Sequence, residues 1–184
     1  ARSPPPSASA STFHSINFAM IIRPTLKLAK KLHEPDLSAA LGPARDPLLD
    51  WHAALFVANR YQYMLVMNTF SLFSVVLPGS GSVGLGAFLD EVLAGIRDTR
   101  ADSGLFLDPS RIAPNTGRVS ICKTLGPSPV GSLNDMVWHA SGHLIEDGLS
   151  PLEASLRLND MPCGPLKYRT PLEFTQEMAQ LPIK

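Results

Sequence analysis

Four residues with metal-binding or acid–base side chains lie close together in the second half of the chain. They are Asp135, His139, His143 and Glu146. If the segment is helical, His139 and His143 lie one turn apart on the same side, where two imidazoles can hold one metal ion. A carboxylate of Asp135 or Glu146 would then act as a third ligand or as a general base. The spacing thus fits a divalent-metal site.

The same residues also have a purely structural interpretation. A His-Glu-x-x-His motif would carry its catalytic glutamate at position 140, but Ala140 and Ser141 follow His139 here. Two partly buried histidines that hydrogen-bond to the neighbouring carboxylates explain the pattern equally well. We therefore expect no obligatory cofactor and treat a divalent metal as the alternative.

The element that must position these side chains is a helix over 133–147. Gly142 costs such a helix about 1 kcal/mol relative to alanine, so its presence predicts the close approach of another backbone or of a ligand. We expect this flank to line a concave, partly exposed pocket. The inward stripe at helical spacing consists of Leu133, Met136, Val137, Ala140 and Leu144.

A second motif, Gly-x-Gly-x-x-Gly, occupies positions 79–84 and has the form of a dinucleotide-binding loop. Asp108 stands where an acid that binds the ribose would be expected. However, the preceding strand belongs to a predicted hairpin, and too few strand–helix units remain for a doubly wound sheet. We interpret the glycines as a connection between sheet and helix, with no bound nucleotide.

The two cysteines give little support for nucleophilic or thiolate-metal chemistry. Cys122 lies within a predicted strand, and Cys163 lies in a Pro/Gly-containing loop with no activating base near it in sequence. Two cysteines form neither a disulfide framework nor a four-thiolate zinc site. Their number favours a reducing, cytoplasmic setting.

The remaining pattern predicts an α+β fold whose sheet is antiparallel, an early meander of strands packed by helices mostly from the C-terminal half. Helices are expected after Thr25 and over 87–99, and capping boxes at Ser132, Ser150 and Thr170 predict three later helix starts. Strands are expected at 20–23, 51–58, 61–67, 71–77 and 118–124.

Composition and charge restrict the class of protein. The 184 residues are 45% hydrophobic and 17% charged, which suits one folded domain. Sixteen basic and sixteen acidic residues give a net charge of zero, which disfavours nucleic acid as a partner. No apolar stretch is long enough to cross a membrane. We expect residues 1–19, rich in Ser and Pro, to form a flexible tail, and 20–184 to form a single domain.

An ordered set of short motifs resembles a known family. These motifs are Met-Ile-Ile-Arg at 20–23, Asp-Trp-His-Ala at 50–53, Asn-x-x-Ser-Leu at 68–72, Gly-Ser-Leu-Asn-Asp at 131–135, Leu-Asn-x-Met-Pro at 158–162 and Tyr-Arg-x-Pro at 168–171. Together they resemble domain of unknown function 6933 (DUF6933) over residues 20–172. The resemblance implies a single-domain bacterial protein, sometimes encoded near mobile-element or plasmid genes, and it brings no catalytic residues.

These features together predict a binding or regulatory interaction module with a protein partner. Association of the chain with further copies of itself is also compatible with the sequence. The alternative is a small metal-dependent hydrolase that uses the helix carrying His139 and His143. Metal content distinguishes the two.

Overall fold

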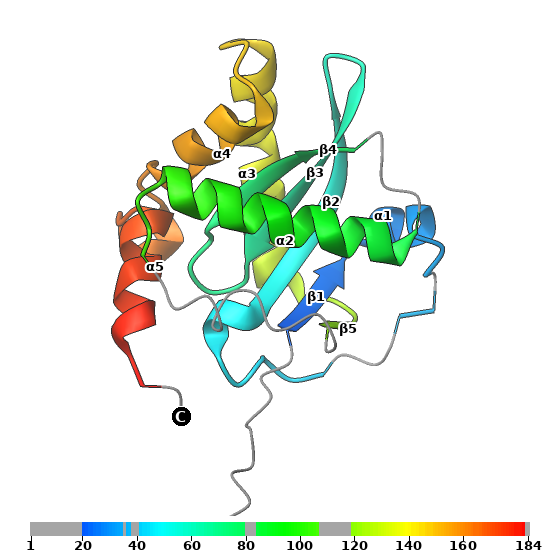
Figure 1. The fold of residues 1–184 in the computed structure, drawn as a ribbon, viewed down its shortest axis with the longest axis horizontal. Coiled ribbons are helices and arrows are strands. Elements are labelled where there is room, and N and C mark those ends of the chain that lie inside the picture. Colours follow the sequence, from blue (N-terminus) through cyan, green and yellow to red (C-terminus); the bar gives the residue numbers. More distant parts are fainter. Residues whose placement is uncertain (1–19, 35, 38–40, 80–83, 107–118, 183–184) are drawn as a thin grey trace, which may run out of the picture.

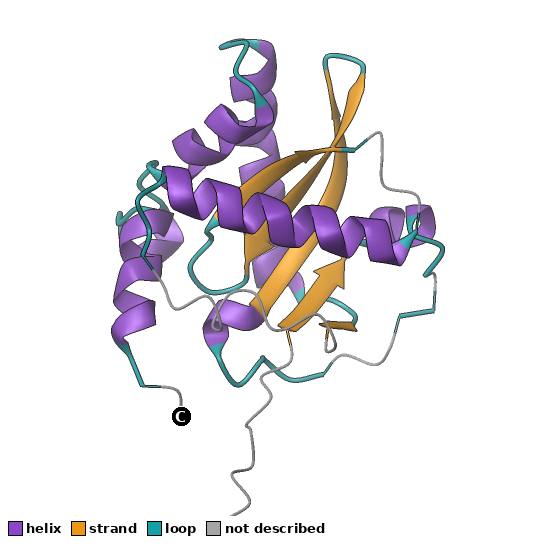
Figure 2. Cartoon of the chain, viewed as in Figure 1, coloured by secondary structure: helices purple, strands orange, loops and turns teal. Residues whose placement is uncertain are grey.

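Five strands form one mixed sheet in the order β4-β3-β2-β1-β5 (Figures 1 and 2). The computed structural model describes residues 20–34, 36–37, 41–79, 84–106 and 119–182. The strands are β1 (Met20–Pro24), β2 (Asp50–Ala58), β3 (Tyr61–Asn68), β4 (Ser74–Pro78) and β5 (Val119–Ile121). The helices are α1 (Leu26–Lys31), α2 (Leu85–Asp102), α3 (Pro127–Ile145), α4 (Pro151–Asn159) and α5 (Pro171–Gln180), with the 3-10 turns η1 (Pro47–Leu49) and η3 (Gly164–Leu166).

The predicted meander is present in one half of the sheet. Strands β2, β3 and β4 pair antiparallel in sequence order. Asn59 and Arg60 connect β2 to β3 with φ angles of 45° and 69°. A two-residue turn with positive φ at both positions matches the right-handed twist of the flanking strands. The turn was correctly predicted, and β2 extends from it without interruption back to Asp50.

The other half of the sheet corrects the sequence-based prediction, because the sheet is not purely antiparallel. Strand β1 lies between β2 and β5 and runs parallel to both. The long connection through α1 allows the chain to return and enter β2 in the same direction as β1. All five residues of β1 are buried, as expected for a parallel strand covered on both faces.

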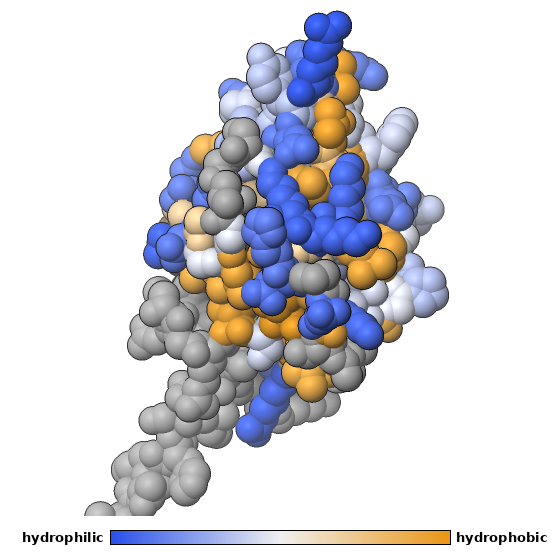
Figure 3. Space-filling model, turned by 90° about the vertical axis from the view of Figure 1, so that its right-hand side faces the viewer, coloured by the Kyte–Doolittle hydropathy of each residue, from blue (hydrophilic) through white to orange (hydrophobic). Residues whose placement is uncertain are grey.

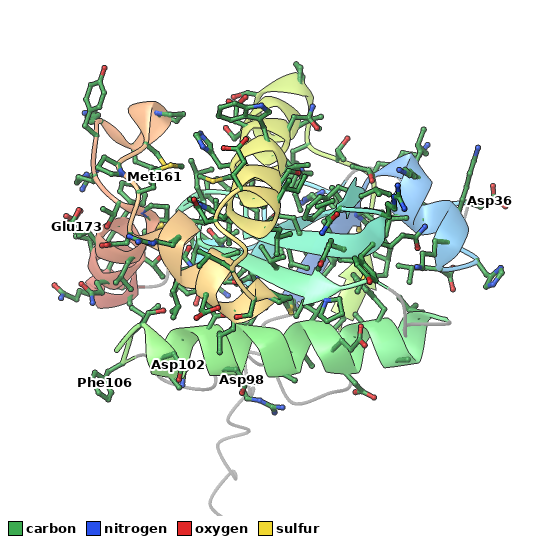
Figure 4. All side chains as sticks on the ribbon, turned by 90° about the horizontal axis from the view of Figure 1, so that it is seen from above. Asp36, Asp98, Asp102, Phe106, Met161 and Glu173 are labelled. Carbon is green, nitrogen blue, oxygen red and sulfur yellow. The ribbon has the colours of Figure 1, made fainter. Side chains whose placement is uncertain are left out.

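Helices cover both faces of this sheet. On one face, α1 and α2 pack over side chains of alternating strand positions, such as Ile22, Ala53 and Val75. On the other face, α3 and α4 pack over the intervening positions, such as Ala54, Leu65 and Val76. Figure 4 shows the sheet between α2 on one side and α3 on the other. The prediction that helices come mostly from the C-terminal half is therefore only partly right, since α2 lies in the middle of the chain.

Helix α4 closes the outer edge of β4. Asn159 accepts a hydrogen bond from the Ser74 amide at 2.7 Å and donates one to the Ser74 carbonyl at 2.8 Å. The Val76 amide donates to the Ser155 hydroxyl at 2.8 Å. These bonds satisfy backbone groups that an edge strand would otherwise leave unpaired. Polar side chains on α4 thus both anchor the helix and protect the sheet edge.

The helix starts test the capping-box predictions. Ser150 and Thr170 each accept a bond from the amide three residues later, and the glutamate there reaches back, as predicted. Ser132 does not cap a helix, because α3 already begins at Pro127 after Gly126. The prolines at 127 and 129 suit the first turn, where no intrahelical N–H bond is required. The prediction for Ser132 is therefore wrong.

Some predictions concern residues outside the described ranges. These are the tail at 1–19, the central part of the glycine motif at 80–83 and Asp108. In the part of the chain that the structure does describe, no helix has the length and apolar character needed to cross a bilayer. Figure 3 shows the side of the molecule that carries α1, where hydrophilic side chains are interspersed with smaller hydrophobic areas.

Candidate functional site

The outer side of α3 carries a groove with a volume of about 330 Å³. Its most prominent side chain is Trp138, which is 73% exposed, and Ile145 beside it is 53% exposed. Burying so large an aromatic ring would gain free energy, so its exposure at a groove makes Trp138 a candidate contact for a partner. The groove is lined by Trp138, His139, Ser141, Gly142, His143, Ile145, Glu146 and Asp147.

The sequence of α3 explains why this side faces outward. Leu133, Met136, Ala140 and Leu144 are buried against the sheet, as the helical spacing predicts. At 100° per residue, Trp138 and Ile145 fall on the opposite side of the helix from this stripe. The groove residues are therefore held by a helix whose inner side is fixed in the core.

Polar contacts fix the orientation of several groove side chains. His143 Nδ1 lies 2.8 Å from Asp147 Oδ2, and since an ionised carboxylate only accepts, the imidazole donates. The Ser141 hydroxyl donates to the Val137 carbonyl at 2.8 Å. The rings of Trp138 and His139 meet edge to face, with centroids 4.8 Å apart. The groove is thus partly preorganised.

The four predicted site residues are only partly brought together. His139, His143 and Glu146 line the groove, whereas Asp135 lines a neighbouring pocket that also includes His139. The carboxylate bonded to His143 is that of Asp147, which is not one of the four predicted site residues. Within the described ranges, no three His, Cys, Asp or Glu side chains lie where they could hold a metal ion together. The metal site remains a prediction. It would be tested by comparing the metal content of the purified wild type with that of the His139→Ala/His143→Ala variant.

The predicted concave, partly exposed setting matches the lining of the groove, but of the two reasons predicted for Gly142, the close approach of another backbone is not observed. A Cβ atom built at Gly142 would meet nothing within 4 Å. Among the described residues no other backbone approaches this position closely, so the glycine leaves open space in the groove, where a ligand, the other predicted reason, could approach. Close approach occurs at Gly95 of α2, where a Cβ would lie 2.4 Å from a Leu77 methyl group.

The neighbouring pocket has a volume of about 220 Å³ and lies between α3 and the segment after α4. Figure 4 labels Met161, which lies in that segment beside α3. Apolar side chains, among them Leu72, Met136 and Pro162, make up much of its lining. Cys163 also lines it, but burial raises the pKa of its thiol. The Sγ–H donates to the Met161 carbonyl at 3.3 Å, so this cysteine is not activated as a nucleophile.

A separate polar cluster lies inside the molecule, around Arg23. This side chain is completely buried and makes five hydrogen bonds. Two of them form a bidentate pair with Asp50 at 3.0 Å, and the other three go to the carbonyls of Leu41, Gly42 and Lys123. All five N–H donors of the guanidinium are thereby used. Arg23 ties three segments of the chain together.

The cluster continues through Thr69 to His52. The Thr69 hydroxyl donates to Asp50 at 2.6 Å and therefore accepts from His52 Nδ1 at 2.9 Å. Burial lowers the pKa of His52 to about 4, the charge of Asp50 opposes this shift, and that of Arg23 adds to it. Nε2 faces the Leu125 amide at 3.5 Å. His52 is fully buried, so we assign the cluster to fold stability.

Sequence reasoning missed both Trp138 and the Arg23–Asp50 pair. Trp138 could have been found, because the helical projection already places it opposite the buried stripe. The Arg23–Asp50 pair joins residues 27 positions apart on two strands whose parallel pairing was not predicted. No local pattern signals such a pair.

Comparison with known proteins gives one significant match. A family model described as Domain of unknown function (DUF6933) matches residues 21–174. No curated protein and no solved structure matches the chain significantly. The match covers all five strands from the second residue of β1 onward, and α1 to α4 in full.

Proposed function

Because the chain belongs to the DUF6933 family, whose description names no activity, we propose a function from the geometry: the protein is an interaction module that binds a protein segment along the outer side of α3. The observation that carries this proposal is the exposure of Trp138 beside a groove. Tryptophan is among the residues that most often dominate the binding energy of protein interfaces.

The surroundings of Trp138 support a binding role. Its helix is anchored to the sheet by four buried side chains, so the ring is presented from a rigid element. Ile145 adds apolar area at the same groove, while His139 and His143 provide polar atoms around it. A mixture of an aromatic anchor and a polar rim is typical of protein interfaces. Both cysteines are free and buried, which supports the proposed action in a reducing compartment.

Selection from a random heptapeptide library displayed on phage tests this proposal. Peptides that bind the wild-type protein should lose at least about tenfold in affinity for Trp138→Ala, because truncation of a central aromatic removes a dominant contact. Tyr61→Ala is the matched control, since Tyr61 is 67% exposed on the β2–β3 hairpin. Binders that tolerate Trp138→Ala as well as they tolerate Tyr61→Ala would refute the proposal.

A further inference from the structure

The charged side chains that line the α3 groove are all acidic among the described residues. Its charged side chains are the carboxylates of Glu146 and Asp147, and no Lys or Arg lines it among the described residues. The neighbouring pocket adds Asp135 and likewise no Lys or Arg from the described part of the chain. Over positions 127–169 the sequence carries five carboxylates and three basic residues, Arg157, Lys167 and Arg169. The excess of acidic side chains is thus found in the linings of the two hollows themselves.

Hydrogen bonds within the groove also favour a positively charged ligand. The Ser141 hydroxyl donates its proton to Val137, so toward the groove it can only accept. His143 donates Nδ1–H to Asp147, which holds that carboxylate at the groove. The acceptor atoms of Ser141 and the two carboxylates suit a donor-rich, positively charged group. They offer little to an anion.

Trp138 completes the match to a cation. A guanidinium or ammonium group is attracted to the face of an aromatic ring within about 6 Å of its centroid, and tryptophan is the best such ring. The rings of Trp138 and His139 are inclined by 74° to each other, and Trp138 is 73% exposed, so most of its surface is accessible to such a group. Trp138 and the carboxylates of Glu146 and Asp147 line one groove and are separated by roughly 12 Å of helix rise, so a basic segment lying along α3 can contact both.

The neighbouring pocket indicates what lies next to that cation. It shares His139 with the groove and is lined largely by apolar side chains such as Leu72, Met136 and Met161. The two hollows together extend along α3 from Ser132 to Ile145, a rise of roughly 20 Å. An extended chain of about six residues covers that length.

We infer that the occupant is an extended basic segment of a partner protein, with an Arg or Lys side chain over Trp138 and an apolar side chain in the pocket beside Met136. This inference rests on the proposed function and specifies its partner. The carboxylates of the groove indicate a positively charged side chain on the partner. The distance between the two adjoining hollows sets the spacing between that side chain and the apolar one.

A charge-reversal selection tests the inference with the same phage-displayed heptapeptide library. Peptides selected on the wild type should be enriched in Arg or Lys at one position and in an apolar residue at another. Glu146→Lys/Asp147→Lys should instead enrich Asp or Glu and should weaken the wild-type peptides by about tenfold or more. Lysine near the end of α3 favours the helix dipole, so this variant should fold, which circular dichroism checks.

The control is Asp98→Lys/Asp102→Lys, which makes the same charge change on exposed positions of α2, on the other side of the sheet (Figure 4). It should select the wild-type peptides. Glu146→Gln/Asp147→Asn provides a milder change if the reversed variant does not fold, and it should abolish the basic enrichment. Trp138-dependent peptides without basic enrichment would overturn this inference and leave the interaction module standing. The absence of any Trp138-dependent peptide would overturn both.

Discussion

Acidification is expected to destabilise the folded protein through His52 before it affects the carboxylates. This imidazole is fully buried, and burial lowers its pKa to about 4 from the ordinary 6.5. Above pH 6.5 the ring is neutral in both the folded and the unfolded chain, so it contributes no pH dependence. Between pH 6.5 and 4 the unfolded chain binds a proton that the folded chain rejects. Stability is therefore lost as the pH falls through this window.

The size of the effect follows from the two pKa values. Each unit of difference corresponds to about 1.4 kcal/mol, so the shift of His52 amounts to about 3 kcal/mol at full protonation of the unfolded chain. Between pH 7.5 and pH 5 the expected loss from this group is about 2 kcal/mol. Asp50 acts at lower pH. Burial would raise the pKa of Asp50, but hydrogen bonds from Arg23 and Thr69 outweigh burial and hold it below 3.8, so its contribution is lost only in stronger acid.

Urea denaturation of the wild type and of His52→Asn across pH 5 to 7.5 measures this effect. The Asn amide can replace the imidazole as donor to Thr69, which retains part of the network in a group that does not titrate. We expect the variant to be less stable at pH 7.5, yet to lose about 2 kcal/mol less than the wild type on going to pH 5. His33→Gln, which removes an exposed imidazole, should keep the wild-type pH dependence.

Parallel stability curves for the wild type and His52→Asn would refute this reasoning. They would mean that His52 accepts a proton in the folded state, and hence that the ring reaches water or a carboxylate in solution.

The remaining predictions concern the contacts that hold the site in place. Arg23→Lys should lower the free energy of unfolding by about 3 kcal/mol or more, because an ammonium group cannot replace the five buried hydrogen bonds of the guanidinium. The control Arg157→Lys, on the exposed side of α4, should lower it by under about 0.5 kcal/mol in the same denaturation assay. Asn159→Ala leaves both backbone groups of a buried β4 residue unpaired and should cost about 2 to 3 kcal/mol; a cost near zero would contradict the edge-sealing role. Ser150→Ala should lower the free energy of unfolding by about 1 kcal/mol, because it removes the N-cap of α4. Ser132→Ala lies inside α3 and should leave the free energy of unfolding unchanged or raise it slightly.

Local patterns in the sequence were sufficient for many of the elements. The turn at Asn59–Arg60 and the capping boxes at Ser150 and Thr170 each depend on a few neighbouring residues, and the structure contains all of them. The apolar stripe of α3 was also correct, because helical spacing reports burial directly.

Features that depend on distant residues could not be derived in this way. The parallel pairing of β1 joins Ile21 to Asp50 and to Ser120, which lie far apart in the chain. Ser132 shows how a local rule fails: the capping-box spacing is present, but Gly126 and Pro127 start the helix earlier. For the site, three of the four predicted residues line the groove on α3, namely His139, His143 and Glu146. The exposure of Trp138 follows from the same helical spacing as the buried stripe, although it was not predicted.

Emission from Trp138 provides the most direct measurement of whether α3 forms a binding surface. The protein has two tryptophans, and Trp51 is 3% exposed, so Trp51→Phe leaves Trp138 as the only indole reporter. A groove peptide selected on the wild type should shift the emission of this variant to shorter wavelength and saturate at one equivalent, since binding removes water from the ring. If the peptide binds the variant and the emission of Trp138 stays that of a water-exposed indole, the peptide is bound elsewhere and the account is contradicted.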